Sequence, residues 1–101
     1  MYLWAVLTTN SKRRIITLMD ELLQRVESAK KAITTVKNKV ARQDLLKMVK
    51  AVDRVMVAAD QESVECRRNR RETPRYRELA QQARDLIINL EQHITFANLL
   101  G

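Results

Sequence analysis

The chain has 101 residues, which is enough for one domain and leaves little for a second. It contains one glycine and one proline, too few turn residues for a doubly wound nucleotide fold, a glycine-rich phosphate loop or a β-sandwich. Because 46% of the residues are hydrophobic and basic residues outnumber acidic ones by 19 to 12, we expect a folded, basic, all-α protein.

The single domain is expected to begin with an apolar arm, or with the first turns of a helix, over residues 1–10. Met1–Leu7 is apolar but too short for a membrane span, and it has neither the basic leader nor the cleavage site of a signal peptide. We expect this arm to pack on a partner through Leu3, Trp4 and Leu7.

The first long helix is predicted over residues 11–38. Its apolar residues recur in steps of four and three, which keeps them on one stripe facing a neighbouring helix. The stripe consists of Ile15, Met19, Leu22, Val26, Ala29, Ile33, Val36 and Val40. Ile16 and Leu23 widen the stripe, which suits contact with two neighbours. Ser11 is a suitable N-cap, although the three bases after it oppose the helix dipole and make a start nearer Met1 the alternative.

The second helix is predicted over residues 44–70, after a turn near residues 38–44. The apolar stripe slips by five positions after Val40, which favours a turn, although no glycine or proline excludes a continuous helix. Asn38 can end the first helix in a left-handed conformation, and Asp44 can cap the second. The second stripe consists of Leu45, Val49, Val52, Met56 and Ala59.

The third helix is predicted over residues 74–98, because Thr73 is a good N-cap and Pro74 suits the first helical position. Its stripe consists of Tyr76, Leu79, Ala83, Leu86, Leu90 and Ala97, with Ile87 and Ile94 beside it. Three such amphipathic helices can bury their stripes within one chain, or the long hairpin can pair with that of a second copy as a four-helix bundle. The broad first stripe and the apolar arm favour the homodimer.

The single cysteine and the single histidine give no site of their own. Cys66 has no partner for an intrachain disulfide, and one cysteine with one histidine, His93, is too few ligands for a metal. We expect Cys66 to be half-buried late in the second helix and His93 to flank the core. Because a lone free thiol suits a reducing compartment, a cytoplasmic location is expected. No metal or other cofactor is predicted.

Positive charge is concentrated in two blocks of the sequence. Residues 30–54 hold eight bases against two acids, and residues 67–77 hold six bases against one acid. In the first block Lys47, Lys50 and Arg54 share one helix face, because they follow one another at i, i+3 and i+7. A rigid row of cations suits the fixed, regularly spaced phosphates of a nucleic-acid duplex. An acidic protein, a membrane surface or plain solvation of the bases is the alternative.

The kind of nucleic acid is inferred from the shape of the basic helices. The few aromatic residues are not interleaved with the bases, which argues against a stacking platform for single strands. Long basic helices without a helix-turn-helix or zinc spacing suit shape-specific binding of A-form duplex RNA. The predicted contacts are Arg54, Lys50 and Lys47 first, followed by Arg42, Lys39, Lys37 and Arg25. A further phosphate contact or a solvated helix end is predicted for Arg67, Arg68, Arg70 and Arg71.

Two short runs resemble a known family. Residues 21–29, Glu-Leu-Leu-Gln-Arg-Val-Glu-Ser-Ala, are similar to the Glu-Leu-x-x-Arg-Ile-Gln-Thr-Ala run on the first helix of the nodavirus-type suppressors of RNA silencing. Residues 52–56, Val-Asp-Arg-Val-Met, resemble that family's Val-x-Arg-Met-Val run, whose RNA-facing arginine corresponds to Arg54. The family's shorter third helix would fall within residues 74–97. The resemblance implies a viral protein of the host cytoplasm, an antiparallel four-helix dimer that shields double-stranded RNA from dicing and small interfering RNA from loading.

No enzyme is predicted, because the sequence contains no Ser/His/Asp set, Cys/His pair or phosphate-binding loop from which a catalytic cleft could be built. We therefore expect double-stranded RNA and a second copy of the chain as partners, without a small-molecule substrate and without a membrane partner. The main alternative is a helical interaction module, an adaptor or co-chaperone-like bundle whose arginine run at residues 67–71 pairs with carboxylates of an acidic protein.

Overall fold

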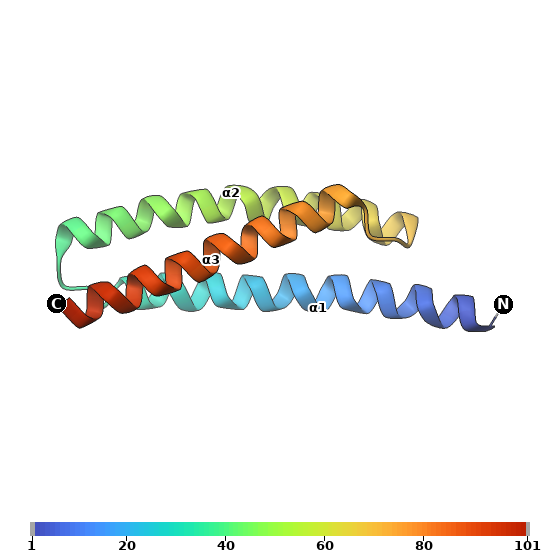
Figure 1. Ribbon diagram of the computed structural model, residues 1–101, viewed down its shortest axis with the longest axis horizontal. Helices are drawn as coiled ribbons and strands as arrows, with labels where there is room; N and C mark the ends of the chain where they lie inside the picture. Colours follow the sequence, from blue (N-terminus) through green and yellow to red (C-terminus); the bar gives the residue numbers. More distant parts are fainter. Residues whose placement is uncertain (1, 101) are drawn as a thin grey trace.

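The computed structural model describes the backbone of residues 2–100 and the side chains of residues 13–100. This part of the chain folds as three α-helices without a strand: α1 (Tyr2–Ile33), α2 (Lys39–Asn69) and α3 (Pro74–Leu100). The prediction of an all-α protein is therefore confirmed. The helices lie side by side in a rod of 58 × 18 × 15 Å, in which α1 and α3 run in one direction and α2 runs in the other (Figure 1).

Helix α1 begins at Tyr2, close to the alternative start near Met1, rather than at Ser11. No glycine or proline interrupts the chain between Tyr2 and Ser11, so the helix includes the stretch that was expected either as an arm or as the first turns of a helix. The expected contact of Leu3, Trp4 and Leu7 with a partner lies outside the described side chains.

The turn between α1 and α2 occupies residues 34–38, several residues earlier than predicted. The Thr34 and Thr35 hydroxyls each donate a 2.6 Å hydrogen bond to a carbonyl of the last turn of α1, which satisfies groups that a helix end leaves free. Asn38 is extended at φ −72° and ψ 119°, and its side-chain oxygen accepts from the Ala41 amide at 3.1 Å. Asn38 is therefore the N-cap of α2 and does not end α1 in a left-handed conformation.

Two further expectations about this turn are wrong for the same reason. Because α2 already begins at Lys39, Asp44 lies inside the helix instead of capping it. Val36 closes the core at the turn, so Val40 belongs to α2, where its position faces solvent with 67% of its surface exposed. The interruption of the apolar pattern thus marks the turn between the two helices, and it comes directly after Val36 and not after Val40.

The turn between α2 and α3 is held by a compact set of hydrogen bonds. Arg70 is the C-cap of α2 in the left-handed region, at φ 57° and ψ 36°, and its amide donates to the Cys66 carbonyl. The Thr73 hydroxyl accepts from the Tyr76 amide at 3.1 Å, and Pro74 is the first residue of α3, as predicted. Cys66 is completely buried rather than half-buried, because Thr73 lies against it with its amide 3.4 Å from the sulfur.

One continuous core runs along the rod. The predicted stripes of α1, up to Val36, and of α2 are buried as expected. On α3 the buried residues are Tyr76, Ala80, Ala83, Ile87, Leu90 and Ile94. Leu79, Leu86 and Ala97 are only partly buried against this core. The buried face of α3 is rotated relative to the prediction, because the regular row of buried residues runs through Ala80 and Ile87 and not through the adjacent Leu79 and Leu86.

Candidate nucleic-acid interface

The outward side of α2 carries the bases that the sequence ranks first. Lys47, Lys50 and Arg54 are exposed, and the residues on the opposite side of the helix belong to the core. Lys39 lies at the start of the same outward side, because eight residues separate it from Lys47. These four bases are called the α2 ridge, and they extend over about 22 Å along the helix at a rise of 1.5 Å per residue.

The α2 ridge is not neutralised by neighbouring carboxylates. None of its four bases forms an ion pair with a side chain that the structure describes. The acid next to Arg54 in the sequence, Asp53, turns toward α1, where its carboxylate lies 3.4 Å from the Lys30 ammonium. Asp53 is therefore engaged with Lys30, which also lies 3.6 Å from Glu27, and not with Arg54, which is exposed.

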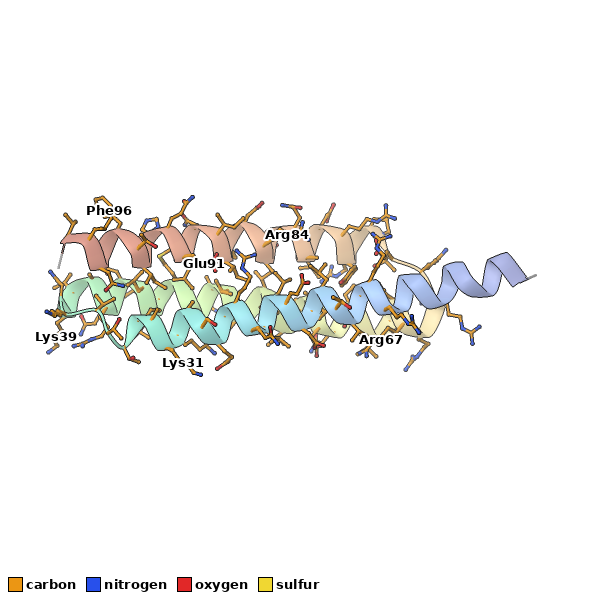
Figure 2. The ribbon with its side chains drawn as sticks, turned by 90° about the horizontal axis from the view of Figure 1, so that it is seen from below. Lys31, Lys39, Arg67, Arg84, Glu91 and Phe96 are labelled. Carbon is orange, nitrogen blue, oxygen red and sulfur yellow. The ribbon has the colours of Figure 1, made fainter. Side chains whose placement is uncertain are left out.

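The α1–α2 turn adds further bases at the end of the ridge. Lys37 is exposed within the turn, and Arg42 is half-buried with Nη1 3.4 Å from the Val36 carbonyl oxygen. Lys31 is exposed on the last turns of α1 and lies toward the same end as Lys39 (Figure 2). Lys31 was missed as a candidate, although its place in the first basic block was the signal that could have identified it.

Arg25 lies apart from this group, in the contact between α1 and α3. Its Nε donates to the Glu91 carboxylate at 3.3 Å, and its Nη2 forms a second hydrogen bond to the same group. The hydrogen bonds to Glu91 raise the pKa of Arg25, because they stabilise the charged guanidinium. Its charge is thus used to hold α1 against α3, and we leave it out of the candidate interface.

The second basic block lies at the opposite end of the rod, and three of its six arginines pair with nearby carboxylates. Arg68 pairs with Glu65 at 3.5 Å, Arg75 with Glu62 at 3.7 Å and Arg77 with Glu72 at 3.3 Å. The remaining candidates of this block are Arg67, Arg70 and Arg71. Arg67 Nε lies 3.4 Å from the Ser63 carbonyl oxygen, whereas Arg70 and Arg71 are exposed in the turn.

A shallow groove of about 600 Å³ lies between α1 and α3. It contains three arginines, Arg13, Arg14 and Arg84, but also Glu72, which pairs with Arg14 at 3.5 Å. Its mixed charge and open shape give no catalytic arrangement. Nearby, the Tyr76 hydroxyl is buried without a hydrogen-bond partner, and burial raises the pKa of Tyr76 to about 12.

The described residues contain no group of three His, Cys, Asp or Glu side chains that could hold a metal ion. His93 is exposed on α3 with its Nδ1 2.8 Å from the Asn89 carbonyl oxygen, and it does not flank the core as expected.

Within the described chain, no helix has a long enough apolar stretch to cross a bilayer. No protein-family model, no curated protein and no solved structure matches this chain.

Proposed function

We propose that this protein binds double-stranded RNA through the α2 ridge without reading its sequence. The observation that carries the proposal is the row of exposed bases Lys39, Lys47, Lys50 and Arg54, which has no ion-pair partner among the described side chains. A straight helix holds these cations at fixed spacing, so that they can meet several phosphates of a rigid duplex without ordering a flexible segment first.

The surroundings of the ridge favour a duplex over a single strand. Single-strand binding relies on aromatic side chains on which bases stack, and neither described aromatic is available on this surface. Tyr76 is buried, and Phe96 projects from α3, away from the ridge (Figure 2). The wide, shallow minor groove of A-form RNA presents phosphates and 2′-hydroxyls to such a surface, which supports RNA over DNA.

Shielding of duplex RNA from dicing and loading is the biological role that we attach to this binding. A protein that covers phosphates without sequence preference hides any duplex from an enzyme that must grip the same backbone. The similarity of residues 21–29 and 52–56 to the nodavirus-type suppressors of RNA silencing supports the same role, in which Arg54 would contact RNA.

We also propose that a second copy packs on the face formed by α1 and α2. Four large aliphatic residues are exposed there, Ile16 and Leu23 on α1 and Val57 and Val64 on α2. Exposed apolar residues gathered on one face are typical of an interaction surface. In a paired form they would be withdrawn from water, and the two hairpins would form a four-helix contact with α3 on the outside.

An antiparallel pair on this face would match some of its charges, although it would also bring the Asp20 side chains of the two copies close to the axis. Ile16 and Leu23 lie seven residues apart on α1, Asp60 and Arg67 lie seven apart on α2, and all four line one small hollow between the helices. One two-fold axis through the hollow would therefore bring Ile16 of one copy onto Leu23 of the other and Arg67 onto Asp60. Neither Asp60 nor Arg67 has an ion-pair partner among the described side chains.

A titration of RNA and DNA duplexes of equal sequence and length, with the matching single strands, tests the proposed function. We expect tight binding of duplex RNA, weaker binding of duplex DNA and little binding of single strands. A sedimentation measurement on the same sample is expected to give the mass of two chains, and Leu23→Glu should return it to one chain. If the folded parent protein binds no duplex, RNA binding is disproved, whatever mass the sedimentation measurement gives.

A further inference from the structure

Arginine side chains from two helices converge on the shallow groove between α1 and α3. Arg13 and Arg14 reach it from α1, and Arg84 reaches it from α3, where it lies on the side of α1 (Figure 2). Thr17 adds an exposed hydroxyl to the same lining. The volume of about 600 Å³ is within the range of sites that hold small molecules, about 300–1,000 Å³. We call this site the arginine groove.

Two of the three arginines have no carboxylate partner. Neither Arg13 nor Arg84 forms an ion pair with a described side chain, and residues 1–12 contain no acid. Arg84 is half-buried, and its Nη1 donates to the Gln81 side-chain oxygen at 3.2 Å. This hydrogen bond orients the guanidinium without neutralising it. Both arginines therefore keep their positive charge for a ligand.

The two glutamates of the arginine groove do not cancel this charge. Glu72 pairs with Arg14 at 3.5 Å and with Arg77 at 3.3 Å, so two guanidinium groups share its single negative charge. Glu21 is the other acid of the lining. With the two arginines that have no partner, four guanidinium groups meet two carboxylates here, which leaves an excess of two positive charges.

We propose that the arginine groove binds the phosphate monoester group of a small molecule. Such a group carries about two negative charges and three terminal oxygens, so it matches the excess charge and can accept hydrogen bonds from guanidinium groups of both helices. A carboxylate, or a phosphodiester of the RNA backbone, has a single charge and two terminal oxygens, which one guanidinium group satisfies. The lining contains no aromatic residue on which a base could stack, so we expect the phosphate to determine the affinity.

The arginine groove is separate from the surfaces to which the proposed function assigns RNA and a second copy. Helix α2 contributes no residue to its lining, so the α2 ridge stays free when the groove is occupied. Ile16 and Leu23, which we assign to the contact with a second copy, are not lining residues either. Binding of a phosphate monoester therefore goes beyond RNA binding and does not depend on it.

Isothermal titration calorimetry with ribose 5-phosphate tests the proposal, first with the unmodified protein. We expect binding of ribose 5-phosphate, about tenfold or more weaker binding of the diester dimethyl phosphate, and no binding of ribose. The double variant Arg13→Gln/Arg84→Gln should lose about tenfold or more in affinity for ribose 5-phosphate. Glu21→Gln should bind ribose 5-phosphate about two- to fivefold more tightly, because it removes a negative charge beside the phosphate.

A control of equal charge separates the arginine groove from the α2 ridge. Lys47→Gln/Lys50→Gln removes the same two charges as Arg13→Gln/Arg84→Gln, and it should weaken duplex RNA binding while the affinity for ribose 5-phosphate changes less than about twofold. Circular dichroism checks that each variant keeps the helical content of the parent.

Three results would overturn the proposal. The first is a folded parent that does not bind ribose 5-phosphate, and the second is equal affinity for ribose 5-phosphate and dimethyl phosphate. The third is an equal loss of ribose 5-phosphate affinity in the groove and ridge variants. If the parent instead prefers 5′-phosphorylated over unphosphorylated RNA without binding ribose 5-phosphate, and Arg13→Gln/Arg84→Gln abolishes this preference, the groove belongs to RNA ends and the proposal is likewise overturned.

Discussion

The two ends of α2 have similar charge in the sequence but differ in the folded protein. At the α1–α2 end the ridge bases project into solvent without ion-pair partners among the described side chains, and the turn is short. At the α2–α3 end Glu62, Glu65 and Glu72 pair with the nearby arginines, and Thr73 joins Cys66 and Glu62 in one hydrogen-bonded set. Carboxylates one or two turns away thus decide whether a basic block is available to a ligand or stabilises the fold.

The largest expected effect comes from removing two bases of the α2 ridge. Lys47→Ala/Arg54→Ala should weaken duplex RNA binding by about ten- to a hundredfold, because two phosphate contacts are lost. Arg68→Ala/Arg75→Ala removes the same charge from bases that already have carboxylate partners, and it should weaken binding less than threefold. Fluorescence anisotropy with a labelled duplex measures both, and circular dichroism checks the helical content. Equal losses in the two variants would show that only net charge matters.

Loss of the N-cap should lower the unfolding free energy more at the α2–α3 turn than at the α1–α2 turn. Thr73→Ala removes the N-cap of α3 and the 2.9 Å hydrogen bond to Glu62, so it should cost about 2 kcal/mol of unfolding free energy. Asn38→Ala removes only the N-cap of α2 and should cost about 1 kcal/mol. Urea unfolding at neutral pH gives both values. A larger loss for Asn38→Ala would contradict the tighter bonding that we assign to the α2–α3 turn.

Tyr76 gives the α2–α3 end a dependence on alkaline pH. Its pKa is raised to about 12 in the folded protein from the ordinary value of 10.0, because its hydroxyl is buried. Between these values the unfolded chain releases a proton that the folded chain keeps, so rising pH favours unfolding. The stabilisation is complete below pH 10 and is lost as the pH rises to 12.

The variant Tyr76→Phe isolates this effect. It removes a hydroxyl that has no hydrogen-bond partner, so its stability at neutral pH should equal or slightly exceed that of the parent. Between pH 10 and pH 12 it should lose about 1–2 kcal/mol less stability than the parent. Parallel curves of unfolding free energy against pH would show that Tyr76 titrates normally in the folded protein.

The smallest expected effect concerns the C-cap of α2. Arg70 adopts a left-handed conformation that glycine tolerates at lower cost, so Arg70→Gly should raise the unfolding free energy by about 0.5–1 kcal/mol. The midpoint of thermal unfolding measures the change, with Arg71→Gly as the control outside the left-handed position. A stabilisation of the control but not of Arg70→Gly would contradict the assigned cap.

The helices could be read from the sequence because their signals are local and repeated. The apolar steps along α1 and α2 and the Thr73-Pro74 restart of α3 predicted three helices and most of the core. The α1–α2 turn was placed too late because Asn38 can either end one helix or begin the next, and only its extended backbone decides between them. The buried face of α3 was misjudged because apolar residues occur there in adjacent pairs, Leu79-Ala80 and Leu86-Ile87, and the second member of each pair is the buried one.

The candidate interface was predictable only in part. Lys47, Lys50 and Arg54 could be placed on one face from the sequence, because residues at i, i+3 and i+7 share a face of any α-helix. The pairing of Arg25 with Glu91, 66 residues later in the chain, depends on how α1 and α3 lie together.

The salt dependence of duplex RNA binding tests the central claim most directly. For the parent protein the logarithm of the affinity should fall steeply and linearly with the logarithm of the salt concentration, by about 0.7–0.9 per phosphate contacted. In Lys47→Ala/Arg54→Ala this slope should decrease in magnitude by about two contacts, and in Arg68→Ala/Arg75→Ala it should be unchanged. Identical slopes in all three proteins would contradict the assignment of the α2 ridge as the surface that meets the phosphates.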